Sequence, residues 1–201
     1  SCCLNILLKG LSEVGDFDGA YKVFDEFPLQ RCGRNARSYA TLMHGLCERG
    51  RVDEAIGLVS RLEGEGVEVD AVVFNVLISG LRKDGRVDEG MEMLERMVSK
   101  GCEPNEGTYL EVLYGLVDAG RFVEAKEFVG RMLGEGHKPS FAAYKKLVCG
   151  LCEEKLVEDV DWVLKKMVKQ GFVPRMGTWK QILGCVLVGD NASSLGGILG
   201  E

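Results

Sequence analysis

The chain has 201 residues, of which 46% are apolar and 28% are charged, and this balance excludes an intrinsically disordered polypeptide. The formal net charge is -6, which counts against nucleic acid as a partner because nucleic-acid-binding proteins usually carry a basic face. No run of 18 apolar residues occurs, so we expect no membrane-spanning segment and no membrane partner.

Glycine recurs with a constant period of 35 residues along the chain. Three series keep this period without an insertion: Gly10, Gly45, Gly80, Gly115 and Gly150; Gly15, Gly50, Gly85 and Gly120; Gly66, Gly101, Gly136 and Gly171. A fixed period of this length is typical of a repeat protein, in which each unit buries its apolar face against its neighbours. We interpret the glycines as residues that end the helices and form the turns between them.

The period predicts a single array of repeats over residues 1–188. Its units are 1–35, 36–70, 71–105, 106–140 and 141–175, followed by the first helix of a partial sixth unit at 176–188. Residues 189–201 are predicted to form a C-terminal tail or a short capping helix.

Each unit has the pattern of a helical hairpin. In the unit 36–70, the apolar residues Tyr39, Leu42 and Leu46 share one face of a first helix. Gly50 ends that helix, and acidic residues follow in the first turn of a second helix, where the helix dipole favours them. The same pattern in the other units predicts an all-α fold.

The sequence shows no constellation for catalysis or for a metal. Cys149 and Cys152 form a C-x-x-C pair, but two thiols supply half of a zinc site and no second such pair follows. Glu153 and Glu154 are adjacent on a predicted helix and therefore do not face each other as an acid and a base would. We predict no metal, no cofactor and no enzymatic activity, and we interpret the cysteines as small apolar residues.

The residues of the repeat resemble those of a known family. Residues 44–55 read HGLCERGRVDEA and residues 80–89 read GLRKDGRVDE. This pattern resembles the pentatricopeptide repeat (PPR) family over nearly the whole chain, whereas the tetratricopeptide repeat has a period of 34 residues. Units of constant length resemble the P-type subgroup. The resemblance implies a right-handed α-solenoid superhelix of stacked helix-turn-helix units.

The resemblance also implies binding of single-stranded RNA, with one base facing each unit. It assigns base selection to the fifth and last residues of a unit, base stacking to the second, and phosphate contact to a lysine at the thirteenth. The implied selector pairs are Asn5 with Asn35, Ala40 with Asp70, Asn75 with Asn105, Leu110 with Ser140, and Lys145 with Arg175. The two asparagine pairs imply C or U, because an amide carries both a donor and an acceptor. Unit three alone adds Val72 at the second position and Lys83 at the thirteenth.

Other positions fit RNA less well and leave a second hypothesis open. Ala40 and Leu110 have no hydrogen-bonding side chain, and Lys145 with Arg175 has no acceptor. Acidic residues occupy the thirteenth position of four units: Glu13, Glu48, Asp118 and Glu153. The alternative is a structural or protein-binding scaffold in an organellar ribonucleoprotein such as the mitochondrial ribosome. A basic groove on the first helices would favour RNA, and an acidic or apolar groove would favour protein. The resemblance implies a mitochondrial location, with the chloroplast as the alternative.

Overall fold

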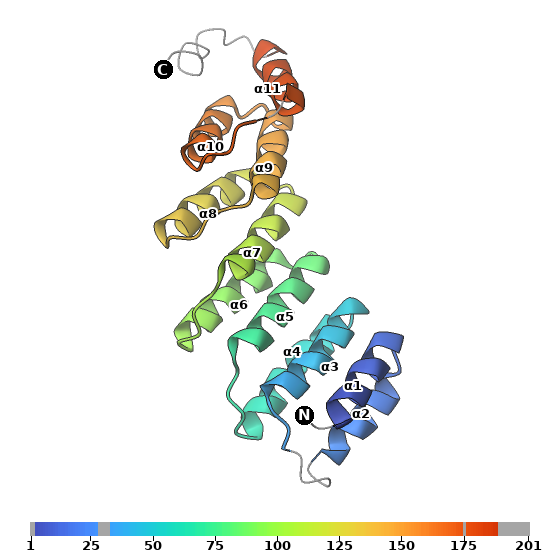
Figure 1. Ribbon diagram of the computed structural model, residues 1–201. Coiled ribbons are helices and arrows are strands. Elements are labelled where there is room, and N and C mark those ends of the chain that lie inside the picture. The colour runs from blue at the N-terminus through green and yellow to red at the C-terminus, as the bar shows by residue number, and fades with distance from the viewer. Residues whose placement is uncertain (1–2, 28–32, 175, 189–201) are drawn as a thin grey trace. The chain divides into compact units, whose positions relative to one another are not determined.

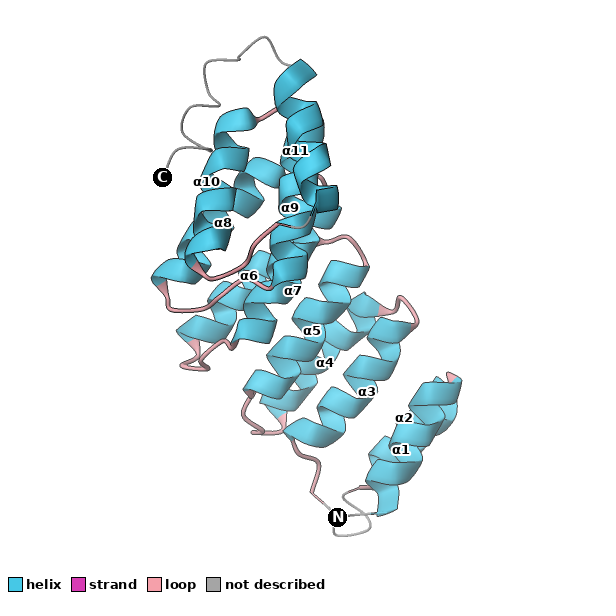
Figure 2. Cartoon of the chain, turned by 45° about the horizontal axis from the view of Figure 1, so that its top comes forward, coloured by secondary structure: helices cyan, strands magenta, loops and turns pink. Residues whose placement is uncertain are grey.

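The computed structural model describes residues 3–27, 33–174 and 176–188 (Figure 1). Within these residues the chain forms eleven helices and no strand, and short loops join the helices (Figure 2). The prediction of an all-α fold is therefore confirmed. The predicted tail at 189–201 and the implied selector Arg175 lie outside the described residues.

Consecutive helices form hairpins in the predicted register. Their bounds are α1 Cys3–Val14, α2 Phe17–Glu26, α3 Ala36–Glu48, α4 Val52–Gly64, α5 Ala71–Lys83, α6 Val87–Ser99, α7 Glu106–Asp118, α8 Phe122–Gly134, α9 Phe141–Glu153, α10 Val157–Lys169 and α11 Met176–Val188. The odd-numbered helices are the first helices of the repeats, and α11 is the first helix of the partial sixth repeat.

The chain divides into two compact units, residues 1–112 and 113–201, with the boundary inside α7. In the first compact unit α1 packs on α2 and α3, and α3 packs on α4 and α5. In the second compact unit α9 packs on α8, α10 and α11. First helices of successive repeats therefore lie side by side within each compact unit.

The last residue of a repeat caps the first helix of the next one. The side-chain oxygens accept hydrogen bonds from backbone N–H groups as follows: Asn35 from Ser38, Asp70 from Val73, Asn105 from Thr108, and Ser140 from Ala143. The first N–H groups of a helix have no partner inside the helix, so each cap stabilises the helix by about 1 kcal/mol. Residues that the resemblance assigns to base selection thus also have a structural role.

Left-handed backbone follows the first helix of each repeat. Gly50 and Gly85 have φ values of +71° and +75° directly after α3 and α5. Glycine adopts this conformation at no steric cost, which is why it commonly ends helices. In the fifth repeat Lys155 takes the same place with φ of 58°. The interpretation that glycines end the helices is confirmed at these turns.

Aromatic side chains at the fourth position of the repeat form the centre of the core. Tyr39, Phe74, Tyr109 and Tyr144 are no more than 1% exposed. The ring of Tyr39 meets the ring of Phe24 edge to face, with 4.8 Å between their centroids. Burial of such a side chain contributes about 1.5–3 kcal/mol relative to exposure, so each of these residues stabilises the stack of helices.

One series of glycines lies inside helices rather than after them. A Cβ atom on Gly45 in α3 would lie 2.5 Å from the Cβ of Ser12, and one on Gly80 in α5 would lie 2.4 Å from the Sγ of Cys47. Successive first helices therefore approach each other more closely than a side chain would allow. The interpretation that every glycine ends a helix is wrong for Gly45 and Gly80, because the distance between helices, and not the backbone conformation, requires glycine there.

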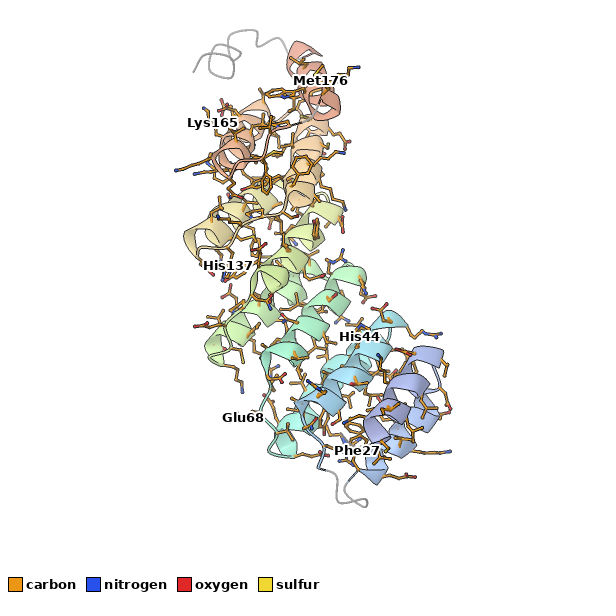
Figure 3. All side chains as sticks on the ribbon, in the orientation of Figure 1. Phe27, His44, Glu68, His137, Lys165 and Met176 are labelled. Carbon is orange, nitrogen blue, oxygen red and sulfur yellow. The ribbon has the colours of Figure 1, made fainter. Side chains whose placement is uncertain are left out.

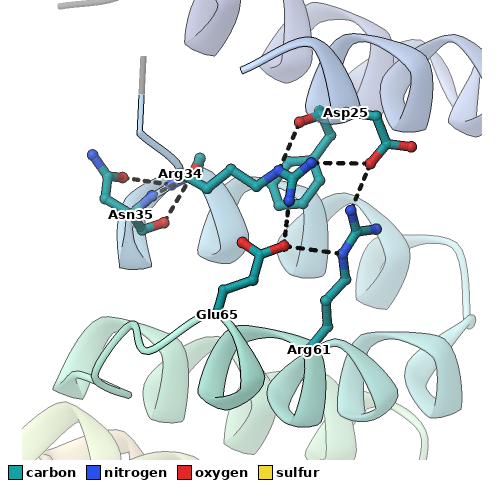
Figure 4. Close-up of polar contacts among 7 residues, drawn as sticks. Asp25, Arg34, Asn35, Arg61 and Glu65 are labelled. Carbon is teal, nitrogen blue, oxygen red and sulfur yellow. Dashed lines mark hydrogen bonds and ion pairs between the residues drawn. The ribbon is translucent and has the colours of Figure 1, made fainter. Parts of the chain in front are cut away.

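A cluster of four charged residues joins α2, α4 and the segment before α3 (Figure 4). The Nε atom of Arg34 donates to the carbonyl oxygen of Phe24 at 2.9 Å, and its Nη2 donates to Asp25 at 3.2 Å. Arg34 also pairs with Glu65, and Arg61 donates to the same Asp25 oxygen at 2.5 Å. The Arg34 side chain is 11% exposed, and its guanidinium lies 4.9 Å from the centre of the Phe24 ring.

We expect Arg34→Ala to lower the free energy of unfolding by about 1–2 kcal/mol, because it removes a largely buried side chain and leaves the part-buried carbonyl of Phe24 without its charged donor. Arg96→Ala is the matched control. Arg96 pairs with Glu63 at 40% side-chain exposure, and the loss of such a solvent-exposed pair should change stability much less. Urea denaturation of both variants measures the difference, and equal losses would contradict the structural role of Arg34.

Candidate nucleic-acid interface

Three first helices, α1, α3 and α5, line a groove of about 620 Å³ in the first compact unit. Lys9, Arg37, Ala40, His44 and Val72 are among its lining residues. Figure 3 labels His44, which projects from α3 with 64% of its side chain exposed. The groove thus gathers residues from the second and fifth repeat positions, to which the resemblance assigns contact with RNA.

Two of the ionisable side chains along this groove, Lys9 and His44, lie beside carboxylates of their own helices. The Nζ atom of Lys9 lies 3.7 Å from Glu13, and the Nε2 atom of His44 lies 3.8 Å from Glu48. Arg37 adds a further exposed positive charge. The groove is therefore of mixed charge, neither strongly basic nor strongly acidic, and its charge by itself favours neither kind of partner.

Lys83, the residue implied to meet phosphate, pairs with an acidic residue of the preceding repeat. Its Nζ atom contacts the Glu48 carboxylate, and this hydrogen bond lowers the pKa of Glu48. Both side chains are 45% exposed, so water competes for the pair and its net contribution to stability is small. The lysine lies on the expected helix, but Glu48 partly neutralises its charge.

Asn75 is connected to Asn105 through Thr108, for which the sequence offered no signal. The Oγ1 atom of Thr108 donates to the Oδ1 atom of Asn75 at 2.6 Å. The backbone N–H of Thr108 donates to the Oδ1 atom of Asn105 at 3.0 Å. Thr108 is 2% exposed. The structure therefore brings together the two asparagines that the resemblance pairs, through a buried hydroxyl at the start of α7.

The asparagines of unit one are arranged differently. The Oδ1 atom of Asn5 is buried and has no hydrogen-bond partner among the described residues. Ser38 occupies the repeat position of Thr108, but its hydroxyl donates to the backbone oxygen of Asn35 at 2.8 Å. Asn5 and Asn35 consequently lack the bridge that joins their counterparts in unit three.

The remaining implied selectors occupy several environments. Ala40 is 5% exposed and offers the groove no polar group. Asp70 and Ser140 are intermediate in exposure and cap α5 and α9. Leu110 is half-buried, whereas Lys145 is exposed.

In the second compact unit, α7 and α9 place an aromatic ring beside paired charges. The Nζ atom of Lys146 lies 3.0 Å from Asp118 and 5.5 Å from the centre of the Tyr114 ring. The Tyr114 hydroxyl lies 3.0 Å from the Oγ atom of Ser140. Tyr114 and Lys146 occupy the ninth and sixth repeat positions, to which the resemblance assigns no role, so the sequence did not single them out.

Within the described part of the chain, no group of three or more His, Cys, Asp and Glu side chains is placed to hold a metal ion. Cys152 is buried, and burial raises the pKa of the Cys149 thiol. A raised pKa keeps a thiol protonated, which makes it a poor metal ligand and a poor nucleophile. None of the described helices has the length and apolarity needed to cross a membrane.

Two family models match the repeats of this chain. The model of the PPR repeat family matches residues 34–83 and 69–118, and the PPR repeat model matches residues 2–32, 108–137 and 142–172. The chain belongs to the pentatricopeptide repeat family. The PPR assignment agrees with the constant period of the glycines and with the hairpin register of the helices.

Curated PPR relatives match short segments of the chain. A mitochondrial pentatricopeptide repeat-containing protein of Arabidopsis thaliana is 51% identical over 40 residues, which are 20% of this chain and 10% of the relative. A second mitochondrial protein of this description from the same plant is 41% identical over 61 residues, which are 30% of this chain and 7% of the relative. The matched segments thus span a tenth or less of the length of these relatives.

Solved PPR structures share the fold. The crystal structure of PPR10 from maize has a TM-score of 0.68 at 25% identity and covers 98% of this chain and 28% of its own. PPR10 in complex with an 18-nt psaJ RNA element has a TM-score of 0.66 at 28% identity, over 81% of this chain and 24% of that one. Nuclear protein-only RNase P 2 of Arabidopsis thaliana has a TM-score of 0.73 at 17% identity, over 96% and 43%. This last likeness concerns the fold alone.

Proposed function

We propose that this PPR chain binds single-stranded RNA along the first helices of its repeats and that unit three takes a pyrimidine. The observation that carries the proposal is the bridge from Asn75 through Thr108 to Asn105, which organises an implied selector pair. The similarity to PPR10, whose structure was solved with an RNA element, supports the same function.

Each side chain of unit three has a distinct role in this proposal. Val72 is 53% exposed, so its apolar surface can pack against the face of an unstacked base. Asn75 hydrogen-bonds the edge of that base, and Asn105 supports Asn75 through Thr108. Lys83 lies near a phosphate and adds affinity without selecting the sequence.

The other units contribute less in this proposal. Asn5 and Asn35 form a second pyrimidine site, weaker because no buried hydroxyl bridges them. Units two, four and five have no amide at the fifth position, so we expect them to tolerate any base. The chain therefore recognises RNA with degenerate specificity.

We place this activity in organellar RNA metabolism or translation. The mitochondrial names of two relatives support mitochondria as the location, and the chloroplast is the alternative. Sequencing of RNA that copurifies with the protein from isolated mitochondria tests both the location and the target.

A second candidate function is protein binding inside an organellar ribonucleoprotein. The specific observation behind this alternative is that Glu13 pairs with Lys9 and Glu48 pairs with Lys83, so carboxylates stand where phosphates would approach, although the groove as a whole is of mixed charge. Under this alternative, Glu48→Lys abolishes association with a protein partner, whereas Asn75→Ala has no effect on any ligand.

Selection from a randomised pool of single-stranded RNA tests RNA binding directly. We expect enrichment of sequences with one well-defined pyrimidine, and an affinity that falls as salt rises because phosphate contacts release counterions. Fluorescence anisotropy with the enriched oligonucleotide, and with DNA of the same sequence, measures the affinity. Absence of enrichment over a control without protein would reject RNA binding.

Asn75→Ala is expected to lower the discrimination between pyrimidine and purine at one base of the enriched RNA by about threefold to tenfold, the contribution of one hydrogen bond. Leu110→Ala is the matched control, because Leu110 holds the same repeat position without a polar group. Affinities for oligonucleotides substituted at each base give the result. Unchanged discrimination in Asn75→Ala would remove Asn75 from the interface.

A further inference from the structure

The hydroxyl of Thr108 is within hydrogen-bonding distance of both Asn75 and Asn105. It lies 2.6 Å from the Oδ1 atom of Asn75, and it accepts a hydrogen bond from the backbone N–H of Asn105 at 3.2 Å. The residue is 2% exposed and belongs to the first turn of α7, so the side chain has little freedom to turn away. A hydroxyl carries one proton, and its recipient determines what the neighbouring amide can do.

The distances identify Asn75 as the recipient of that proton. A separation of 2.6 Å is typical of an O–H···O hydrogen bond and is short for an N–H···O bond. The other acceptor in reach, the Oδ1 atom of Asn105, is farther away at 3.2 Å and already accepts from the Thr108 backbone N–H. The Asn75 carboxamide therefore directs its oxygen toward Thr108.

The opposite edge of the Asn75 carboxamide is the part available to a ligand. Asn75 is half-buried, and its Nδ2 group makes no hydrogen bond to a described residue. An asparagine that is free to rotate by half a turn offers either a donor or an acceptor to a base. With its oxygen committed to Thr108, Asn75 offers a donor alone.

We propose that Thr108 is a positioning residue for base selection, which fixes Asn75 as a hydrogen-bond donor and thereby makes unit three prefer cytosine to uracil. This inference rests on the proposed binding of RNA. Cytosine has adjacent acceptors at N3 and O2, whereas uracil places a donor, N3–H, between its O2 and O4 acceptors. A fixed N–H donor is therefore satisfied along more of the cytosine edge and is opposed by the N3–H of uracil.

The residue that corresponds to Thr108 differs between the repeats. A hydroxyl follows both asparagines at the fifth position, as Ser38 after Asn5 and Thr108 after Asn75. Val73 and Ala143 hold this position after Ala40 and Leu110, whereas Thr178 follows Lys145. Both amides at the fifth position are therefore followed by a hydroxyl, although the hydroxyl is not confined to those repeats. In unit one Ser38 donates to the Asn35 backbone, so we expect less discrimination there.

The test compares Thr108→Val and Thr108→Ala, which remove the hydroxyl, with Thr108→Ser, which keeps it. Val73 and Ala143 occupy the same position in this chain, so both replacements suit its backbone. The probes are two synthetic RNAs from the selection described above, with C or U at the base whose preference depends on Asn75. Their dissociation constants are measured by anisotropy, and a urea titration reports the stability of each variant.

We expect the native chain and Thr108→Ser to bind the C probe about three- to tenfold more tightly than the U probe, the difference of one hydrogen bond. In Thr108→Val and Thr108→Ala this ratio should fall toward one. If the role of Thr108 is purely structural, both hydroxyl-free variants will bind the two probes equally less tightly and the ratio will stay unchanged. That result would overturn the inference. A native preference for U, or none, would also overturn it.

The outcomes separate this inference from the proposed function. If no RNA binds, both are rejected. If RNA binds and Asn75→Ala alters discrimination while the two hydroxyl-free variants keep the native ratio, the chain is an RNA-binding protein in which Thr108 has no selective role.

Discussion

Replacing Gly45 by alanine is expected to lower the free energy of unfolding by about 2–3 kcal/mol, as overpacking of a closely packed contact does. The new methyl group would lie 2.5 Å from the Cβ of Ser12 and 3.3 Å from its Cα atom. A flexible side chain could move aside, but the backbone of α1 cannot do so without separating α1 from α3. Because the repeats are stabilised by their neighbours, that separation weakens the whole stack.

The matched control is Gly57→Ala in α4. Gly57 is exposed inside a helix, and a Cβ there would meet nothing within 4 Å. The substitution should therefore raise stability by about 0.5–1 kcal/mol, because alanine restricts the unfolded chain. Urea denaturation measures both variants, and a gain in stability in Gly45→Ala would show that α1 and α3 do not approach as closely as described.

Glu48→Gln is expected to raise the affinity for single-stranded RNA by about three- to tenfold at low salt. The slope of the logarithm of the binding constant against the logarithm of salt concentration should become steeper by about 0.7, the value for one phosphate contact on a single strand. Glu48 is charged at neutral pH, as an ordinary glutamate is, and the hydrogen bond from Lys83 lowers its pKa further. Glutamine keeps the size of the side chain and removes the charge, so Lys83 becomes available to phosphate. A titration of the enriched RNA at several salt concentrations gives both quantities.

Two further variants isolate the contribution of this pair. Glu92→Gln on α6 makes the same change in net charge away from the first helices, and we expect it to alter affinity much less. Lys83→Ala should weaken binding more in the Glu48→Gln background than in the native chain, which a double-mutant cycle measures. Equal effects of Glu48→Gln and Glu92→Gln would indicate that net charge, and not the release of Lys83, controls the affinity.

The sequence by itself determined the repeat and its helices. Gly50 and the acidic residues after it predict the end of one helix and the start of the next, because capping and backbone conformation depend on neighbours within a few residues. The apolar spacing of Tyr39, Leu42 and Leu46 predicts which face is buried for the same reason. With the period of 35 residues, these local signals sufficed to predict the helices, whereas the family was inferred from the resemblance of residues 44–55 and 80–89 to the PPR pattern.

Only the tertiary structure decided which residues of one repeat contact which residues of the next. The glycine in α3 is required by a residue of α1, and the Thr108 hydroxyl meets an amide 33 residues earlier. Lys83 likewise pairs with a carboxylate 35 residues earlier. These contacts depend on how closely two helices approach and on which rotamers then meet. Neither follows from local pattern, because a periodic sequence predicts that repeats stack but not which atoms touch.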